Sequence, residues 1–471
     1  MKKDYKPYIK DIVEQLNAQN LNIFAGAGMS VASGFVNWSE LLRPIAEELN
    51  LDVNKEANNL VAIAQYHYNK NGGRNAINKR LVEEFSQKGE ININHKILRR
   101  LPIKNYWTTN YDKLIETALN DFGKIVDVKY TLDHLTISKP NRDAILYKMH
   151  GDIDHPNEAV LTKDDYEKYS EKMHSYISIL KSHLITKTFL FIGLSFTDPN
   201  LDYILSRIRL AYKENQKTHY CFMKIISNNG EPDYEYNLNK QDLFIHDLKR
   251  FGIKTICVNE YSEITDYLEL IENEYKKKNV FIAGAVDKFK RGKEKENTNF
   301  ISDLSKKLIC EKYNVISGFG AGVGNIVIDS VLREIYENSE RDIKDRLILK
   351  PFTKNNINDS HRKNRENIIS QAGTAIFLYG NKLNEQGKKI LSHGMKEEFK
   401  IAKEFKVKVI PVGITGDISQ KLWLEENSLI QQNNKISDEY KNKFAELGNS
   451  NNNYQQIIEI IFDLINLNLY K

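Results

Sequence analysis

A glycine-rich turn near the N-terminus constrains the fold of this chain more than any other stretch. The apolar run Ile23-Phe24-Ala25 leads into Gly26-Ala27-Gly28-Met29-Ser30, and a further glycine follows at Gly34. Glycines between a strand and a helix let the backbone approach a diphosphate closely, and the N–H groups of the helix then face its charge. The pattern predicts a dinucleotide-binding domain. Glycines also form tight turns that bind nothing, so this stretch by itself leaves a structural turn as the alternative.

The composition sets the size and the class of the protein. At 471 residues the chain is too long for one ordinary core, so two or three domains are expected. Its 68 basic and 63 acidic residues give a formal net charge of +5 and are mixed throughout, which argues against nucleic acid as a partner. The apolar runs are too short to span a membrane and no signal segment is recognisable, so we expect a cytoplasmic protein without membrane attachment.

The cysteines argue against a metal site. Cys221, Cys257 and Cys310 are widely spaced and form no Cys-x-x-Cys pair. That spacing excludes a four-cysteine zinc module and argues against the disulfide framework of a secreted protein. No bound metal is therefore expected.

Three further apolar runs in the first half end in polar turns. Tyr106-Trp107-Thr108 is followed by Thr109-Asn110-Tyr111-Asp112, Ala144–Met149 by His150-Gly151, and Thr188–Ile192 by Gly193-Leu194-Ser195. In open α/β sheets, ligands bind at the C-terminal ends of the strands. Asn110 and His150 are therefore candidate functional residues.

Each of these polar residues also has a structural alternative. The turn that holds Asn110 is what helix capping requires, with a helix expected to start near Asp112. A histidine at a strand end can equally be structural. Asp198 followed by Pro199 predicts the N-cap and the first residue of the next helix.

The second half repeats the alternation of strands and helices. A short charged connector, Tyr275–Asn279, precedes the apolar run Val280–Ala285, and we place a domain boundary there. A later strand, Tyr313–Ile316, opens into Gly318-Phe319-Gly320-Ala321-Gly322-Val323-Gly324, the densest run of glycines in the chain. The alternation predicts an α/β protein with two Rossmann-like domains, 1–277 and 278–471, each a mostly parallel sheet flanked by helices.

The turns of the first half share their order with a known family. Gly26-Ala27-Gly28-Met29-Ser30, Thr108–Asp112, His150-Gly151 and Gly193-Leu194-Ser195 together resemble a sirtuin. The second half resembles a SLOG domain, a Rossmann-like domain that binds nucleotide-derived ligands. In this order and at this length, the two resemble the NAD-consuming effectors of the Thoeris anti-phage defence system. The resemblance implies an enzyme that hydrolyses NAD+ to nicotinamide and ADP-ribose.

Carried over residue by residue, the resemblance implies two catalytic residues. Asn110 would orient the nicotinamide ribose and the attacking water, and His150 would be the general base at the ribose hydroxyls. These residue types suit the chemistry, because a histidine titrates near neutrality and a neutral amide holds water without competing as a nucleophile. NAD+ would be bound by Ala25, Gly26, Ala27, Gly28, Ser30, Asp112, Gly193 and Ser195, with Ser195 on the adenosine side.

Two departures from deacetylating sirtuins bear on the reaction. The zinc-binding cysteines are absent, and Gly34-Phe35-Val36-Asn37-Trp38 stands where those enzymes have Pro-Asp-Phe-Arg. Without the zinc module a peptide groove is not expected, so water becomes the acceptor. A protein deacylase is an alternative that the missing cysteines disfavour. A non-catalytic nucleotide sensor or scaffold is a second alternative, which Asn110 and His150 together disfavour.

The SLOG half departs from relatives that cleave nucleoside monophosphates, because its glycine run lacks their proline, threonine and following glutamate. A binding role is therefore expected. The resemblance implies activation by a cyclic ADP-ribose isomer that a partner TIR-domain protein makes, and a homo-tetramer or larger assembly.

Arg365 and Glu398 are candidate activator ligands, because arginine matches the shape of phosphate and a carboxylate can accept from ribose hydroxyls. The alternative for both is a solvated helix face. The full set expected to bind the activator is Gly284, Gly318, Gly320, Gly322, Arg365, Gly380, Asn381 and Glu398.

Overall fold

The computed structural model describes residues 4–56, 59–87, 89–228, 230, 232–289, 293–338, 346–349 and 358–467. The chain divides into two compact units, Met1–Glu274 and Tyr275–Lys471. The predicted connector, Tyr275–Asn279, is mostly helix and strand, because a helix ends at Lys276 and a strand begins at Asn279. That residues 1–277 and 278–471 are the two domains stays a prediction.

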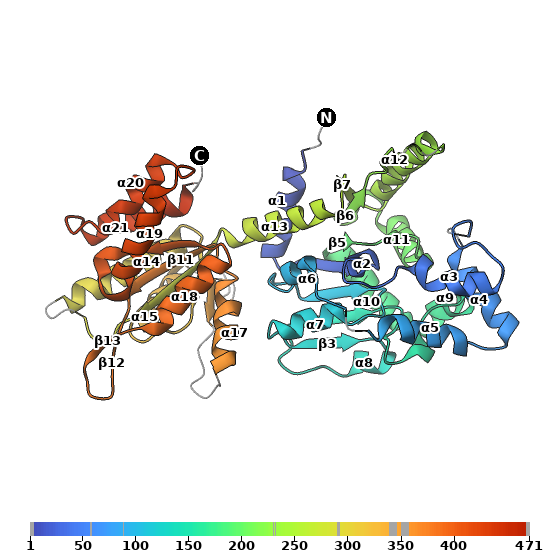
Figure 1. The fold of residues 1–471 in the computed structure, drawn as a ribbon, viewed down its shortest axis with the longest axis horizontal. Helices are drawn as coiled ribbons and strands as arrows, with labels where there is room; N and C mark the ends of the chain where they lie inside the picture. The colour runs from blue at the N-terminus through green and yellow to red at the C-terminus, as the bar shows by residue number, and fades with distance from the viewer. Residues whose placement is uncertain are drawn as a thin grey trace. The chain divides into compact units, whose positions relative to one another are not determined.

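The first unit is built on a seven-stranded sheet in which every neighbouring pair is parallel (Figure 1). Two central strands are buried along their whole length, as expected where helices cover both faces of a sheet. The strand order is β3 (Val126–Lys129), β4 (Ala144–Lys148), β2 (Asn105–Thr108), β1 (Leu21–Ala25), β5 (Thr188–Ile192), β6 (His219–Lys224) and β7 (Ile253–Val258).

Helices follow most of these strands, and large aromatic side chains fill the core on one face. Phe24, Trp107, Phe189 and Phe191 come from the central strands and belong to one buried cluster. The α-helices are α1 (Lys6–Asn17), α2 (Gly28–Val31), α3 (Trp38–Glu48), α4 (Leu60–Asn71), α5 (Asn75–Phe85), α6 (Ile93–Leu98), α7 (Leu114–Asp121), α8 (Leu132–Thr136), α9 (Lys163–Lys172), α10 (His174–Thr186), α11 (Pro199–Tyr212), α12 (Tyr234–Arg250) and α13 (Ser262–Lys276).

The register of the sheet brings four strand ends to one level. Ala25 of β1 pairs with Thr108 of β2 and with Ile192 of β5, and Thr108 pairs with Lys148 of β4. The chain leaves the sheet just beyond each of these residues. The glycine turn, Asn110, His150 and the Gly193 turn therefore stand at one edge of the sheet.

The second unit has its own parallel sheet and a separate hairpin. The sheet order is β10 (Leu347–Leu349), β9 (Asn314–Ser317), β8 (Asn279–Ala285), β11 (Thr374–Tyr379) and β14 (Lys408–Pro411), and β12 (Asn381–Leu383) pairs antiparallel with β13 (Lys389–Leu391). Its α-helices are α14 (Glu294–Cys310), α15 (Val323–Asn338), α17 (Asn358–Ile369), α18 (His393–Glu404), α19 (Asp417–Gln432), α20 (Asp438–Glu446) and α21 (Tyr454–Asn466).

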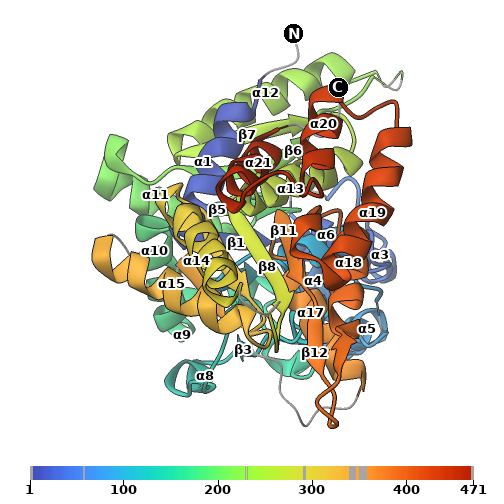
Figure 2. The same ribbon diagram turned by 90° about the vertical axis from the view of Figure 1, so that its left-hand side faces the viewer.

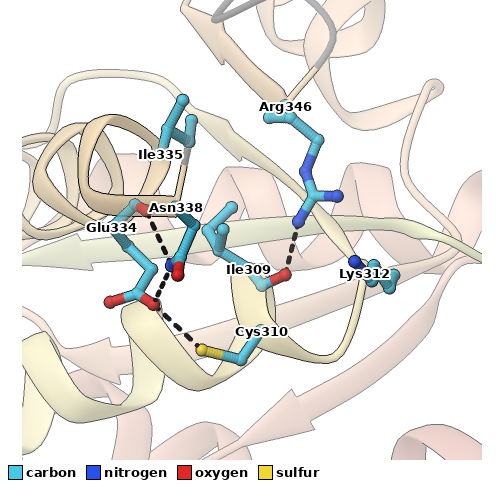
Figure 3. A pocket seen from close by; sticks show the side chains of 7 residues that line it. All are labelled: Ile309, Cys310, Lys312, Glu334, Ile335, Asn338 and Arg346. Atoms are coloured by element: carbon cyan, nitrogen blue, oxygen red, sulfur yellow. Dashed lines mark hydrogen bonds between the residues drawn. The ribbon is translucent and has the colours of Figure 1, made fainter. Parts of the chain in front are cut away.

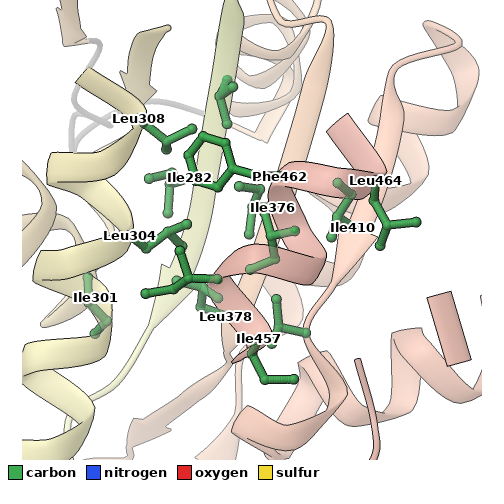
Figure 4. Packing of buried hydrophobic residues seen from close by; sticks show 14 of the residues in the cluster. Ile282, Ile301, Leu304, Leu308, Ile376, Leu378, Ile410, Ile457, Phe462 and Leu464 are labelled. Carbon is green, nitrogen blue, oxygen red and sulfur yellow. The ribbon is translucent and has the colours of Figure 1, made fainter. Parts of the chain in front are cut away.

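Aliphatic side chains hold this second sheet to its helices. Figure 4 shows Ile282 and Ile376 of adjacent strands packed against Leu304 of α14 and Phe462 of α21. Figure 2 shows α14 and α15, which pack together, beside β8. The predicted α/β class and the two mostly parallel sheets are confirmed. Among the described residues, the longest apolar helices are still too short or too polar to cross a membrane.

Candidate functional site

Backbone contact with the Gly193 turn explains the glycines that follow β1. Gly26 N–H donates to the Ile192 carbonyl and Gly28 N–H to the Gly193 carbonyl, both at 2.9 Å. A Cβ on Gly26 would lie 2.4 Å from the Gly193 oxygen, and one on Gly28 would lie 2.9 Å from the Gly193 Cα. Any side chain at either position would therefore push the two strand ends apart.

This arrangement differs from the diphosphate cradle expected from the sequence. The Gly26 and Gly28 amides donate within the protein, so this structure does not present them to a ligand. The α2 helix has four residues and supplies little of the helix-end charge that favours an anion. Ser195 is exposed, with its Oγ 2.7 Å from Thr197 Oγ1. That Ala25, Gly26, Ala27, Gly28 and Ser195 bind NAD+ stays a prediction.

Asn110 is tied to the glycine turn and to Asp112 by a chain of hydrogen bonds. Its Nδ2 donates to the Gly26 carbonyl at 3.1 Å and to Ser30 Oγ at 3.0 Å. Ser30 Oγ in turn donates to Asp112 Oδ2 at 2.8 Å. Asp112 Oδ1 also accepts from the Leu114 N–H at 2.9 Å. The capping alternative for the Asn110 turn is not realised by Asn110, because the N-cap of α7 is Lys113 and the Asn110 side chain bonds to the glycine turn.

The other end of the Asn110 amide is open. Its Oδ1 is buried and accepts no hydrogen bond from any described residue. A buried carbonyl oxygen without a donor is unfavourable, so the site favours a ligand or water that brings an O–H to this atom.

A buried lysine that the sequence analysis did not single out supports the same loop. Lys148 Nζ donates to the backbone carbonyls of Tyr111 and Asp112, at 3.1 and 2.7 Å, and to Asp152 Oδ2 at 2.5 Å. Burial by itself lowers the pKa of Lys148, but the carboxylates of Glu116 and Asp152 outweigh it and raise that pKa. The signal was present as a lone lysine within the apolar strand Ala144–Met149.

His150 faces an acidic partner that the sequence did not reveal. Its Nε2 lies 2.9 Å from Asp198 Oδ2, and both side chains are largely buried. Burial would raise the pKa of Asp198, but the positive charge of His150 and the backbone N–H groups of α11 lower it below its usual value. The sequence predicted Asp198 correctly as the N-cap of α11, and that role masked the contact with His150.

The second unit holds a small cavity of about 80 Å³ at the C-terminal ends of β8 and β9. Five of the expected activator residues, Gly284, Gly318, Gly320, Arg365 and Glu398, line it. It is also lined by Lys382 of the β12–β13 hairpin and by the start of α18 with its N-cap, Ser392, Gly394 and Met395, none of which was predicted from the sequence.

The charges of this cavity pair with one another. Arg365 Nη1 donates to Glu397 Oε2 at 2.5 Å, and Arg365 Nε lies 3.8 Å from Glu398 Oε1. Burial raises the pKa of Glu398 to about 7, although Arg365 and Lys382 act in the opposite direction. The carboxyl group is therefore about half protonated near neutral pH.

Three expected activator residues do not line the cavity. Gly322 lies where a Cβ would meet the Val286 carbonyl oxygen at 1.9 Å, and Gly380 packs against Ile418. Asn381 donates to Asp417 Oδ2 at 2.6 Å. These contacts explain each residue by packing or hydrogen bonding within the unit, and the predicted roles of the three residues in binding the activator stay predictions.

A second hollow of about 220 Å³ contains none of the expected residues (Figure 3). Cys310 Sγ donates to Glu334 Oε1 at 3.1 Å there, and burial together with this carboxylate raises the pKa of the thiol. The thiol therefore stays protonated and is a poor nucleophile. The lining residues are Ile309, Cys310, Lys312, Glu334, Ile335, Asn338 and Arg346. Within the described part of the chain, the acidic, histidine and cysteine side chains form no cluster of three or more that could hold a metal ion.

Comparison with known proteins defines the class. The SIR2-like domain family matches residues 104–244, and the family of Sir2- and TIR-associating SLOG domains matches residues 263–468. The protein therefore joins a SIR2-like domain to a SLOG domain, as the order of the motifs predicted.

Full-length relatives narrow this class to one family. A Bacillus cereus (strain MSX-D12) protein named NAD(+) hydrolase ThsA is 48% identical over 466 residues, which cover 98% of each chain. A protein of the same name from Acinetobacter baumannii (strain 532279) is 41% identical, and the match covers 98% of this chain and 99% of that protein. Another, from Cytobacillus dafuensis, is also 41% identical, and the match covers 99% of this chain and 97% of that protein. The chain belongs to the ThsA family.

Proposed function

We propose that this protein hydrolyses NAD+ and that a cyclic ADP-ribose isomer bound in the SLOG unit activates it. The relatives that share its whole length are named NAD(+) hydrolases. In the reaction, water attacks the ribose carbon that carries nicotinamide, the glycosidic bond breaks, and nicotinamide, ADP-ribose and a proton are released.

The open Oδ1 of Asn110 is the observation that most supports hydrolysis. This oxygen lies at the edge of the sheet where Thr108 pairs with Lys148. Asn110 follows Thr108 by two positions and His150 follows Lys148 by two positions, so the pairing places both candidate catalytic residues at this edge. There it can accept a hydrogen bond from the attacking water or from a ribose hydroxyl, while Nδ2 keeps the amide fixed on Gly26 and Ser30.

His150 supplies the proton acceptor in this proposal. Nicotinamide leaves as a neutral base, so positive charge builds up on the ribose in the transition state. The protein then has to position water and accept its proton, and the unprotonated form of an imidazole can do so.

The SLOG cavity supports the sensing half of the proposal. Arg365 and Lys382 provide positive charge for phosphates beside the glycines of β8 and of the turn after β9. A nucleotide needs several hundred cubic ångströms, more than the cavity of about 80 Å³ now offers. Binding therefore requires side chains to move, and the Arg365–Glu397 pair is the contact that a phosphate would displace.

The test is nicotinamide release from NAD+ by the purified full-length chain, with and without cyclic ADP-ribose isomers. We expect release that rises with one isomer, and we expect light scattering to report a homo-tetramer or larger assembly. NAD+ that stays intact under every condition would favour a non-catalytic sensor. Release that depends on an acylated peptide would favour a deacylase.

A further inference from the structure

The candidate base His150 contacts a single carboxylate held in a defined orientation. Asp198 Oδ1 accepts the Leu201 N–H at 2.8 Å as the N-cap of α11, and Oδ2 is the atom 2.9 Å from His150 Nε2. The cap fixes the carboxylate plane, because rotating the group toward solvent would break the contact with the helix. One side chain thus serves the helix with one oxygen and the histidine with the other.

Two tyrosine rings also contact His150. The rings of Tyr166 and Tyr169 in α9 meet the imidazole edge-on, with ring centroids 5.4 and 6.5 Å away. Burial raises the pKa of both tyrosines well above the usual value, so neither hydroxyl ionises near neutral pH. Tyr111 lies close enough to sense the Asp198 charge, and burial raises its pKa as well. Of the three side chains that contact the imidazole here, Asp198, Tyr166 and Tyr169, Asp198 is the one that carries a charge near neutral pH.

We propose that Asp198 is a positioning residue that keeps Nε2 of His150 protonated and leaves Nδ1 as the atom that accepts a proton. A carboxylate can only accept a hydrogen bond, so whenever the imidazole facing it is in its neutral form, the hydrogen is carried on Nε2. Nδ1 is on the opposite side of the ring from the atom that contacts Asp198 and is thus the nitrogen left for the reaction. When Nδ1 takes up the proton, Asp198 stabilises the resulting imidazolium. The role in turnover rests on the proposed function.

The variant Asp198→Asn separates this role from capping. Its amide oxygen keeps the contact with the Leu201 N–H, and its NH2 group then faces Nε2 as a donor. The imidazole has to present a lone pair at Nε2, which moves its hydrogen to Nδ1 and blocks the base. We expect kcat for NAD+ to fall by about 10²- to 10⁴-fold, the range for loss of a general base, with KM changed much less. Asp198→Ser, which also caps helices but has no carboxylate, should behave in the same way.

The matched control is Asp202→Asn, which removes the same charge from an exposed position in the first turn of the same helix. It should leave kcat unchanged. Nitrogen chemical shifts of ¹⁵N-labelled histidine report the tautomer without any turnover, and the signal of His150 is identified by its loss in His150→Ala. We expect the Nε2–H form in the parent protein and the Nδ1–H form in Asp198→Asn.

Three results would overturn the proposal. One is turnover by folded Asp198→Asn equal to that of Asp202→Asn. Another is loss of turnover without a change of tautomer, which would make Asp198 a helix cap alone. The third is an Nδ1–H imidazole in the parent protein. A parent protein that cleaves no NAD+ would instead contradict the proposed function, and the histidine spectra would still show whether Asp198 sets the tautomer.

Discussion

At the sheet edge of the first unit, polar side chains hydrogen-bond to the backbone and to one another, whereas Arg365 of the SLOG cavity forms ion pairs with the neighbouring carboxylates Glu397 and Glu398. Asn110, Ser30 and Asp112 form a chain that ends on the backbone, with one amide oxygen left open. In the cavity, Arg365 is bound to Glu397 and lies near Glu398.

The difference indicates two kinds of site. Polar groups already fixed in place need no reorganisation when charge develops, which suits catalysis. Charges that pair with each other must exchange partners when a ligand arrives, and a ligand can shift an equilibrium only by such differential contacts. Changes at the first site should therefore alter turnover, and changes at the second should alter the response to the ligand.

The largest effect is expected at the first site. Asn110→Ala and His150→Ala should each lower NAD+ turnover by about 10²- to 10⁴-fold, because each removes a group that positions water or accepts its proton. Nicotinamide release measured by chromatography, at saturating activator, reports the loss.

The controls for this pair are Asn120→Ala and His246→Ala, which remove the same side chains from exposed positions on α7 and α12. Both should keep the turnover of the parent protein. Near-normal turnover by correctly folded His150→Ala protein would remove His150 from the mechanism.

The next largest effect concerns the support beneath this site. Lys148→Met removes the buried cation between Glu116 and Asp152 and leaves Asp152 only the more distant Lys113, 3.8 Å away. Breaking a buried ion pair typically destabilises a protein by about 3–5 kcal/mol. Denaturant unfolding of the first unit should show the loss. Lys168→Met, at an exposed lysine of α9, is the control and should change stability little. A loss for Lys148→Met as small as that of the control would mean that Lys148 does not hold the loop.

The sequence predicted which strand ends stand at the edge of the sheet, but not how they contact one another. Apolar runs that end at glycine, asparagine or histidine predict the sheet edge, since local composition decides where a strand stops. The reason for Gly26 and Gly28 lies in the Gly193 turn, far away in the sequence, and only the pairing of β1 with β5 brings the two together.

Pairing across the fold also explains the residues that were missed. Asp198 had a sufficient local explanation as a cap, so nothing in its neighbourhood pointed to His150. The short hairpin that brings Lys382 to the cavity has only three residues per strand, too few for a recognisable period. The glycines at 318 and 320 line the cavity, and at Gly320 the reason is a close approach of the Gly284 backbone, while their role in binding stays a prediction.

At the SLOG cavity, Arg365→Ala should weaken binding of the activating cyclic ADP-ribose isomer by about 10- to 150-fold, as expected for a hydrogen bond to a charged group worth roughly 1.5–3 kcal/mol. Calorimetry measures the change directly. Arg362→Ala is the control, because this arginine of the same helix pairs with Glu366 and Glu404 and does not line the cavity. Equal affinity in both variants would place the ligand elsewhere.

The smallest effect is a pH dependence of that same affinity. Burial raises the pKa of Glu398 to about 7, against an ordinary value near 4.3, so the folded protein keeps this proton between those two pH values and loses it above the upper one. A phosphate that draws Arg365 away leaves Glu398 with less positive charge beside it and favours the protonated form. Affinity should therefore fall by up to about tenfold between pH 6 and pH 8, the limit for a single linked proton.

Glu398→Gln, which stays neutral throughout, should abolish the dependence in calorimetric titrations. Affinity that rises with pH would instead mean that the ionised carboxylate accepts from ribose hydroxyls, and the phosphates would then lie away from Glu398.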